Sequence, residues 1–344
     1  MSESELPAGT PQSSPLAKQP ILRHVLACVD ASPFAVDAAP FAQAVLAHAA
    51  AVAEAVGARM TVMHVLESPA AHEPIDPVEW ALRHRDATAY LHERMSRIGL
   101  LQADAVILAG VPAERINAWA HDNAADLVVL GRGGESDGFS VELGNTARRV
   151  AELANASVLL APSVQVGDTR IRYRKVLAPL DGSSRSECAL PLGLKIAAAH
   201  EAEMVLVHAA PKVDLIESDL LDAEAVALRD RLYRRNEHAA RQYLDWIRSL
   251  LPATPTIQTR LLPSGDARRA LARAIVKECA DLVVLSSTGK SGHPEMSIGS
   301  IAGYLINHLN IPVLLVRQCK INSPTPHRSP NPAIDTRLPS QGIM

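Results

Sequence analysis

The same six residues, ADLVVL, occur twice in this chain of 344 residues, at Ala125–Leu130 and again at Ala280–Leu285. Matching landmarks follow in the same order around both copies, and several keep the same separation of 155 positions. These pairs are Gly110 with Gly265, Gly134 with Gly289, Gly144 with Gly299, and SVLLA at Ser157 with PVLLV at Pro312. Self-similarity at a fixed period is the signature of a repeat. The chain is therefore predicted to be a duplication whose two copies share one fold.

Each copy alternates short apolar runs with segments long enough to form helices. In the first copy the apolar runs cover residues 25–29, 60–65, 127–130 and 158–160. Continuous apolar runs of this length are typical of strands that are buried on both faces of a parallel sheet. Strands that alternate with helices predict right-handed crossovers. We therefore expect an α/β fold in which each copy is a Rossmann-like, five-stranded parallel sheet with helices on both faces.

The two copies are predicted to form two domains, at residues 20–163 and 172–318. The flanking segments, residues 1–19 and 319–344, are rich in Pro and Ser and are predicted to be disordered tails. Asp76-Pro77 is a predicted helix start, because Asp caps helices and Pro suits the first turn. A second helix, with Leu244 and Ile247 on its apolar stripe, is expected to stop before Pro252.

Charge and motif content exclude several classes of protein. The net charge is −3 and the basic residues are scattered among acids, so no nucleic-acid partner is expected. The 13 histidines form no metal-binding pattern, and the four cysteines form no CxxC pair. No apolar run has the length of a membrane span or the position of a signal peptide. We therefore expect a cytoplasmic protein with no membrane partner and no bound metal.

Polar residues follow the first two predicted strands of each copy, where ligands bind in open parallel sheets. Asp30 and Asp181 end the first strand, and each could accept hydrogen bonds from ribose hydroxyls or cap the following helix. His64 and His208 end the second strand. No nucleophile accompanies these histidines, so a structural role is predicted for them.

The ADLVVL strand runs into a glycine-rich loop in both copies. Glycine lets the backbone approach a phosphate closely and present its N–H groups to it. The helix that begins after the loop adds the partial positive charge of its N-terminus. The candidate positions are Gly131, Gly134, Gly144 and Asn145 in the first copy, and Ser286, Gly289, Lys290, Gly292, Gly299 and Ser300 in the second.

The segments VLAPLDGSS, VLVHA and ADLVVL…Gly-x9-Gly-Ser…IPVLLV resemble the universal stress protein family from about residue 20 to residue 318. The resemblance implies an adenine-nucleotide alpha-hydrolase-like fold that holds ATP, possibly with Mg²⁺. In the second copy it implies Gly289, Gly299 and Ser300 at the phosphates, Lys290 near them, Pro179 and Asp181 at adenine and ribose, and Ala209 at the base. In the first copy it implies Gly131, Gly134 and Gly144, with Asp30 and Val65 in the other roles.

Both copies depart from the family pattern. Ser286 stands at the first glycine position of the second loop. If that position requires a positive φ, a non-glycine residue there costs about 1–2 kcal/mol. In the first copy Asn145 replaces the phosphate-binding hydroxyl residue. The second copy keeps Ser300 and is predicted to be the better nucleotide site.

Two functional hypotheses remain open. The first is an ATP-binding regulatory protein of the stress response that is not an enzyme beyond slow ATP hydrolysis, and that acts on an unknown protein partner. The alternative is a nucleotide-free dimerisation scaffold. By the family resemblance, the last strands, residues 158–161 and 312–316, are expected to pair within one chain, and a homodimer is possible. HxGH and SGGxDS motifs, which related ATP-using enzymes would need, are absent.

Overall fold

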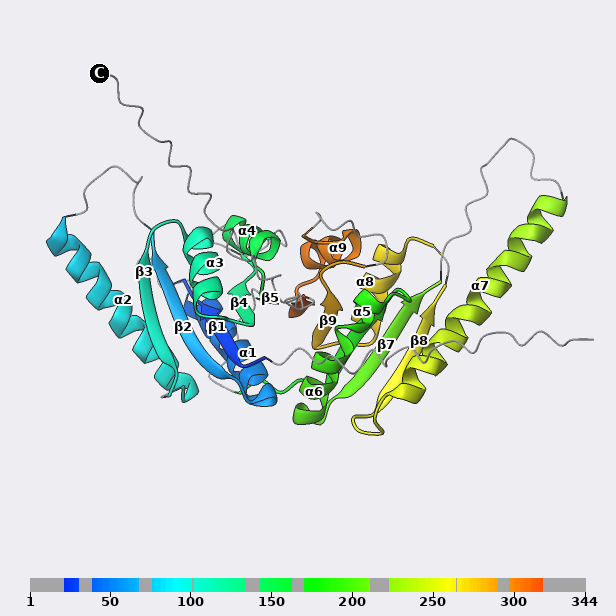
Figure 1. Cartoon of the computed structure of the whole chain (residues 1–344), viewed down its shortest axis with the longest axis horizontal. Coiled ribbons are helices and arrows are strands. Elements are labelled where there is room, and N and C mark those ends of the chain that lie inside the picture. The colour runs from blue at the N-terminus through cyan, green and yellow to red at the C-terminus, as the bar shows by residue number, and fades with distance from the viewer. Residues whose placement is uncertain are drawn as a thin grey trace, which may run out of the picture.

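The computed structural model describes residues 22–30, 39–67, 76–100, 102–133, 143–162, 170–210, 223–263, 265–289 and 297–317 (Figure 1). The predicted tails therefore lie outside the described residues. Strands and helices alternate along each repeat as predicted. The first repeat comprises β1 (His24–Cys28), α1 (Ala39–Val56), β2 (Arg59–Leu66), α2 (Pro77–Ile98), β3 (Asp104–Ala109), α3 (Pro112–Asp122), β4 (Leu127–Gly131), α4 (Asn145–Leu153) and β5 (Ser157–Ala161).

The second repeat follows the same order, and a short helix is described directly after its first strand. It comprises β6 (Lys175–Leu180), α5 (Ser184–Glu187), α6 (Leu190–His200), β7 (Glu203–Ala209), α7 (Ala223–Leu250), β8 (Ile257–Leu262), α8 (Ala267–Lys277), β9 (Leu282–Ser286), α9 (Ser300–His308) and β10 (Val313–Val316). Each apolar run predicted in the first repeat corresponds to a strand, and the ends differ by one residue at most.

All the described strands belong to one ten-stranded sheet in the order β3-β2-β1-β4-β5-β10-β9-β6-β7-β8. Within each repeat the strands pair in parallel, as predicted. The repeats join where β10 pairs with β5 in antiparallel orientation, with Leu314 opposite Leu159. The expected pairing of the last strands within one chain is therefore confirmed, and it lies at the centre of the molecule (Figure 1).

The apolar core is divided by the face of the sheet and not by the repeat. Helices α1, α2, α6 and α7 cover one face, and α3, α4, α8 and α9 cover the other. Successive residues of a strand point to opposite faces, so Val25 and Ala27 join the first layer while Leu26 and Cys28 join the second. Each layer contains residues of both repeats, so the repeats share their core.

Two of the long helices have ends that the sequence predicted. Asp76 caps α2 by accepting a hydrogen bond from the backbone N–H of Val78 at 2.8 Å, as predicted. Gly99 ends this helix with a φ of 77°, a left-handed conformation that glycine adopts easily. Helix α7 ends at Leu250, and Leu244 and Ile247 of its predicted stripe are buried. Within the described residues, no helix has the length and apolarity to cross a membrane.

A polar contact joins the repeats beneath the sheet, where α1 packs against α6. The fully buried side chain of Tyr173 places its hydroxyl 2.8 Å from Nδ1 of His48 in α1. On its other side the Tyr173 ring meets the ring of His200, with centroids 4.9 Å apart. Lys195 of α6 donates to the carbonyl oxygen of Val56 at 3.0 Å. Side chains of both repeats therefore enclose the segment that leads into the second repeat.

Candidate functional site

In the second repeat, the structure brings together two predicted site residues that lie far apart in the sequence. Asp181 follows β6, and Gly289 follows the neighbouring strand β9. A Cβ atom built on Gly289 would lie only 2.4 Å from Oδ2 of Asp181. Such a distance is a clash, so a larger residue at this position would require the Asp181 carboxylate or the loop to move. Glycine accommodates the approach without any shift.

Asp181 also organises the turn that follows β6. Its Oδ1 accepts hydrogen bonds from the backbone N–H of Ser183 at 3.0 Å and from the Ser183 hydroxyl at 2.5 Å. Ser183 in turn caps α5 by accepting from the N–H of Ser186 at 3.2 Å. The residue that caps the helix is therefore Ser183, and Asp181 braces that cap with one oxygen while the other faces Gly289.

Both glycine loops are held to the sheet by the same backbone hydrogen bonds. The N–H of Gly299 donates to the carbonyl oxygen of Ser287 at 2.7 Å, and the N–H of Gly144 donates to that of Arg132 at the same distance. Gly299 and Gly144 are the N-caps of α9 and α4, and among the described residues no side-chain hydrogen bond caps either helix. The first N–H groups of these helices lie at the sheet edge, where they would stabilise an anion.

Ser286 carries no backbone penalty, which corrects the conditional expectation for that position. It is the last residue of β9 and pairs in register with Val316. Neither Ser286 nor Gly131 is among the described residues with a positive φ. A Cβ on Gly131 would lie 3.5 Å from Cγ2 of Val45, which is an ordinary contact. The serine is therefore compatible with the extended strand, and its hydroxyl donates to the carbonyl oxygen of Thr288 at 2.5 Å.

The other predicted residues are placed mostly along the same edge. Pro179 lies in β6, and Ala209, the last residue of β7, is half-buried. Val65 is buried in β2, and Asp30 is exposed after β1. Asn145 and Ser300 are the first residues of α4 and α9. Gly134, Lys290 and Gly292 lie outside the described residues.

The two histidines near the end of the second strand of each repeat have the structural role that was predicted for them. Nδ1 of His64 lies 3.0 Å from the carbonyl oxygen of Val29, and Nδ1 of His208 lies 2.8 Å from that of Leu180. Both side chains are buried, and burial lowers the pKa of His64. Each histidine therefore ties the end of one strand to the end of its neighbour.

A buried carboxyl group beside the second site was missed by the sequence analysis. Glu187 of α5 accepts a hydrogen bond from the Tyr243 hydroxyl of α7 at 2.9 Å. Burial raises the pKa of Glu187, and the charge of Asp181 adds to that rise, whereas the bond from Tyr243 opposes it. The Tyr243 ring also lies 5.5 Å from the ring of His208. No spacing pattern links two residues so far apart in the sequence.

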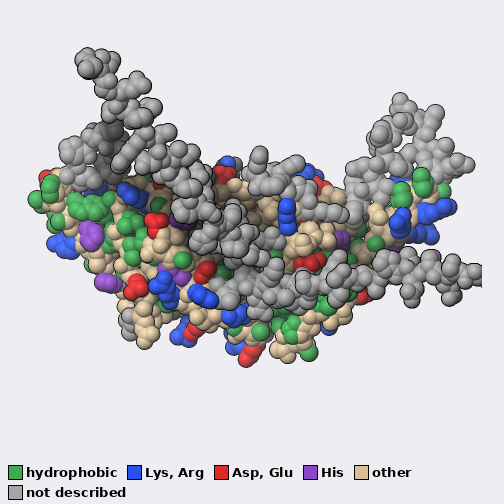
Figure 2. Space-filling model, in the orientation of Figure 1, with side chains coloured by type: hydrophobic (Ala, Val, Ile, Leu, Met, Phe, Trp, Pro, Cys, Tyr) green, Lys and Arg blue, Asp and Glu red, His purple; other side chains and the backbone are tan. Residues whose placement is uncertain are grey.

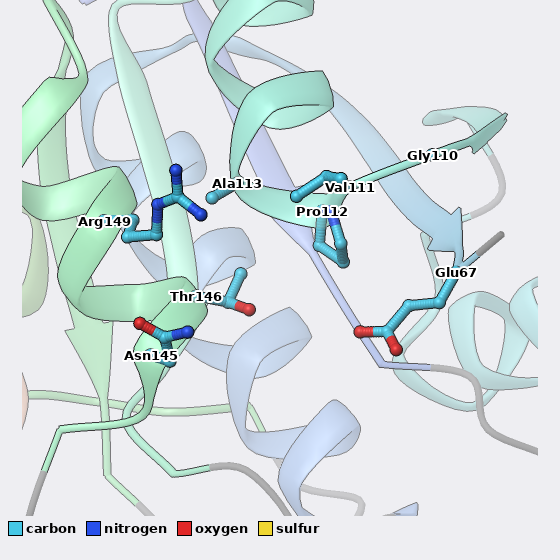
Figure 3. A pocket seen from close by; sticks show the side chains of 8 residues that line it. All are labelled: Glu67, Gly110, Val111, Pro112, Ala113, Asn145, Thr146 and Arg149. Atoms are coloured by element: carbon cyan, nitrogen blue, oxygen red, sulfur yellow. The ribbon is translucent and has the colours of Figure 1, made fainter. Parts of the chain in front are cut away.

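In the first repeat, a crevice of about 250 Å³ opens at the same sheet edge (Figure 3). It lies between the end of β2, the turn after β3 and the N-termini of α3 and α4. Its lining consists of Glu67, residues 110–113, Asn145, Thr146 and Arg149. Of these, only Asn145 was predicted as a site residue. Across the part of the chain that the structure describes, no group of three or more His, Cys, Asp or Glu residues could hold a metal ion.

Comparison with known proteins gives one consistent family. The model of the universal stress protein family matches residues 23–162 and, again, residues 172–317. A universal stress protein of Thermus aquaticus is 35% identical over 128 residues, which cover 37% of this chain and 93% of that protein. A universal stress protein of Mycobacterium tuberculosis is 27% identical over 196 residues, 57% of this chain. The chain spans 63% of the length of that relative.

Solved structures with a similar fold extend over most of the chain. A Pseudomonas aeruginosa protein of unknown function gives a TM-score of 0.58 at 15% identity, covering 87% of this chain and 93% of its own. A universal stress protein from Archaeoglobus fulgidus gives a TM-score of 0.57 at 16% identity, covering 86% and 98%. At these identities the likeness concerns the fold alone.

Proposed function

The chain belongs to the universal stress protein family, and from this premise we propose that it is a regulatory protein that binds ATP at the sheet edge of its second repeat. The observation that carries the proposal is the approach of Gly289 to Asp181, where a Cβ would lie 2.4 Å from Oδ2. The uncapped N-terminus of α9 begins at the same edge. A carboxylate beside a helix N-terminus suits a ligand that carries both hydroxyls and phosphates.

The proposed roles follow from the chemistry of these groups. The ribose hydroxyls donate to the carboxylate of Asp181. The phosphates accept from the first N–H groups of α9 and from the hydroxyl of Ser300, which is exposed at the start of that helix. The half-buried Ala209, at the end of β7, contacts the base. These residues supply binding but no nucleophile, so the proposed role is regulatory, with slow hydrolysis of ATP at most.

The alternative is a scaffold that binds no nucleotide. One observation favours it, because Oδ1 of Asp181 already accepts two hydrogen bonds from Ser183. The shared ten-stranded sheet would then be the functional product of the duplication.

Calorimetric titration of the purified full chain with Mg·ATP distinguishes the two. We expect saturable binding that weakens about 10- to 150-fold in Ser300→Ala, because one hydrogen bond to a charged group contributes about 1.5–3 kcal/mol. Asn145→Ala changes the equivalent position of the first repeat and serves as the matched control, with little effect expected. Absence of heat and of any thermal shift at millimolar ATP would favour the scaffold. Equal affinity in Ser300→Ala and the wild type would remove the site from the second repeat.

A further inference from the structure

The crevice of the first repeat lies where the second repeat carries a side-chain bridge between α8 and α9. In the second repeat, Arg268 of α8 bonds to Asp266 through Nε at 3.1 Å and through Nη2 at 3.2 Å. The same guanidinium lies over the ring of Tyr304 in α9, 5.8 Å from its centroid. These three side chains join the N-terminal turns of α8 and α9.

The equivalent positions of the first repeat hold Val111, Ala113 and Arg149. A valine and an alanine cannot form the ion pair, and the methyl group of Ala113 leaves the space between α3 and α4 open (Figure 3). The crevice therefore lies at positions where the side chains of the first repeat differ from those of the second.

Groups that attract an anion gather at the α4 side of the crevice. Arg149, Thr146 and Asn145 line this side, and in the part of the chain that the structure describes no side-chain hydrogen bond caps α3 or α4. Uncapped helix N-termini carry a partial positive charge. Arg149 lies 3.8 Å from Glu114, but both side chains are exposed, and such surface pairs contribute only about 0–1 kcal/mol. The guanidinium can therefore exchange this partner for a ligand.

The opposite side of the crevice is acidic. Glu67, just after β2, lies across the crevice from Arg149 (Figure 3). Within the described residues its carboxylate forms no ion pair, although its backbone carbonyl accepts a hydrogen bond from Arg83 at 3.2 Å. The two sides thus carry opposite charges, and a ligand that satisfies both must do the same.

We propose that this crevice, defined by Glu67, Ala113, Asn145, Thr146 and Arg149, binds a small zwitterion. Its carboxylate lies at Arg149 and the start of α4, and its protonated amine lies at Glu67. A nucleoside triphosphate fits less well, because Glu67 repels phosphate. The volume of about 250 Å³ is also below the ~300–1,000 Å³ that is usual for ligand pockets. The proposal extends beyond ATP binding, since it gives the two repeats ligands of different class.

The test uses zwitterions of increasing charge separation on the full chain: glycylglycine, 4-aminobutyrate and 6-aminohexanoate. We expect saturable calorimetric binding of at least one, with butyrate and butylamine at least tenfold weaker because each satisfies only one side. If none of the three zwitterions binds at 10 mM, or if butyrate binds as well as 4-aminobutyrate, the proposal is wrong.

Two conservative single variants test where the zwitterion binds. A further variant, which transfers the side chains of the second repeat into the crevice, tests the same point. Glu67→Gln and Arg149→Gln should each weaken binding about tenfold, and both positions are exposed, so folding is preserved. The triple variant Val111→Asp/Ala113→Arg/Arg149→Tyr reproduces the side chains of the second repeat and should abolish binding, whereas Arg268→Gln in the second repeat should leave it unchanged. Binding that survives both single variants would overturn the assignment, as would competition between ATP and the probe. Loss of ATP binding in Ser300→Ala alone would leave this inference untouched.

Discussion

The two repeats keep the same backbone at the sheet edge but differ in the side chains that line it. Gly144 and Gly299 each donate to a carbonyl oxygen of their own loop at 2.7 Å. Beside these shared hydrogen bonds, Arg268 bridges α8 and α9 in the second repeat, whereas residues at the N-termini of α3 and α4 line a crevice in the first. In the described residues, the two repeats agree where backbone hydrogen bonds fix the chain at the sheet edge, and they differ in the side chains that the helices carry.

The outer ends of the molecule show the same divergence. Helix α2 presents Val78 and Leu82 at its outer end, with 66% and 46% of their surfaces exposed. The outer half of α7 instead presents exposed Arg231, Arg234 and Arg235, as expected for a solvated helix face. Figure 2 shows apolar and basic side chains at both ends. The two helices occupy equivalent places in the fold (Figure 1), but the side chains that they expose differ in identity and position.

The largest expected effect concerns whether the two repeats unfold together or as independent units. Leu314 is fully buried in β10 opposite Leu159 of β5. We expect Leu314→Ala to lower the free energy of unfolding by about 2–5 kcal/mol, the usual range for a buried leucine. Because both core layers extend across the repeats, chemical denaturation should still show one transition. Leu153→Ala, at a position that is 60% exposed, is the control. Two transitions, of which only one shifts, would show independent repeats.

The stability of the contact between the repeats, where His48 of α1 meets Tyr173, is expected to depend on pH. Burial lowers the pKa of His48 to about 4 from its ordinary value of 6.5, so the unfolded chain binds a proton more readily than the folded one. The stabilisation is complete above pH 6.5 and is lost as the pH falls towards 4. The loss is about 3 kcal/mol, since each pKa unit corresponds to about 1.36 kcal/mol.

Urea denaturation between pH 7 and pH 4 measures this effect. The variant His48→Gln keeps a side chain able to hydrogen-bond Tyr173 but does not titrate, so its stability should depend less on pH over this interval. An identical pH dependence in the variant and the wild type would show that His48 is not the group responsible.

The smallest expected effect is the difference in stability between two variants, each of which replaces one loop glycine by alanine. Gly289→Ala places a Cβ against Asp181 and should lower stability by about 1–3 kcal/mol, the usual result of inserting a methyl group where no space exists. Gly131→Ala meets only Val45 at 3.5 Å, without a positive φ, and should change stability by less than about 0.5 kcal/mol. Thermal unfolding of both variants measures the difference. Equal losses would mean that the loop at Gly289 moves away from Asp181 at little cost.

The duplication, the strand order along each repeat and the helix cap at Asp76 followed from the sequence, because these features depend on local spacing and burial. The position of Asp181 near the glycine loop also followed, since the carboxyl ends of parallel strands meet at one edge of the sheet. Whether the position of Ser286 requires a positive φ could not be predicted from the sequence, because the conformation of the strand end depends on its pairing with Val316.

Three features emerged only from the tertiary structure: the Glu187–Tyr243 hydrogen bond, the bridge from Arg268 to Tyr304, and the crevice beside Arg149. Each depends on how two helices, distant in sequence, lie side by side on the sheet. The repeating apolar pattern specifies which face of a helix is buried. It does not specify which polar side chains of neighbouring helices come within reach, and those contacts distinguish one repeat from the other.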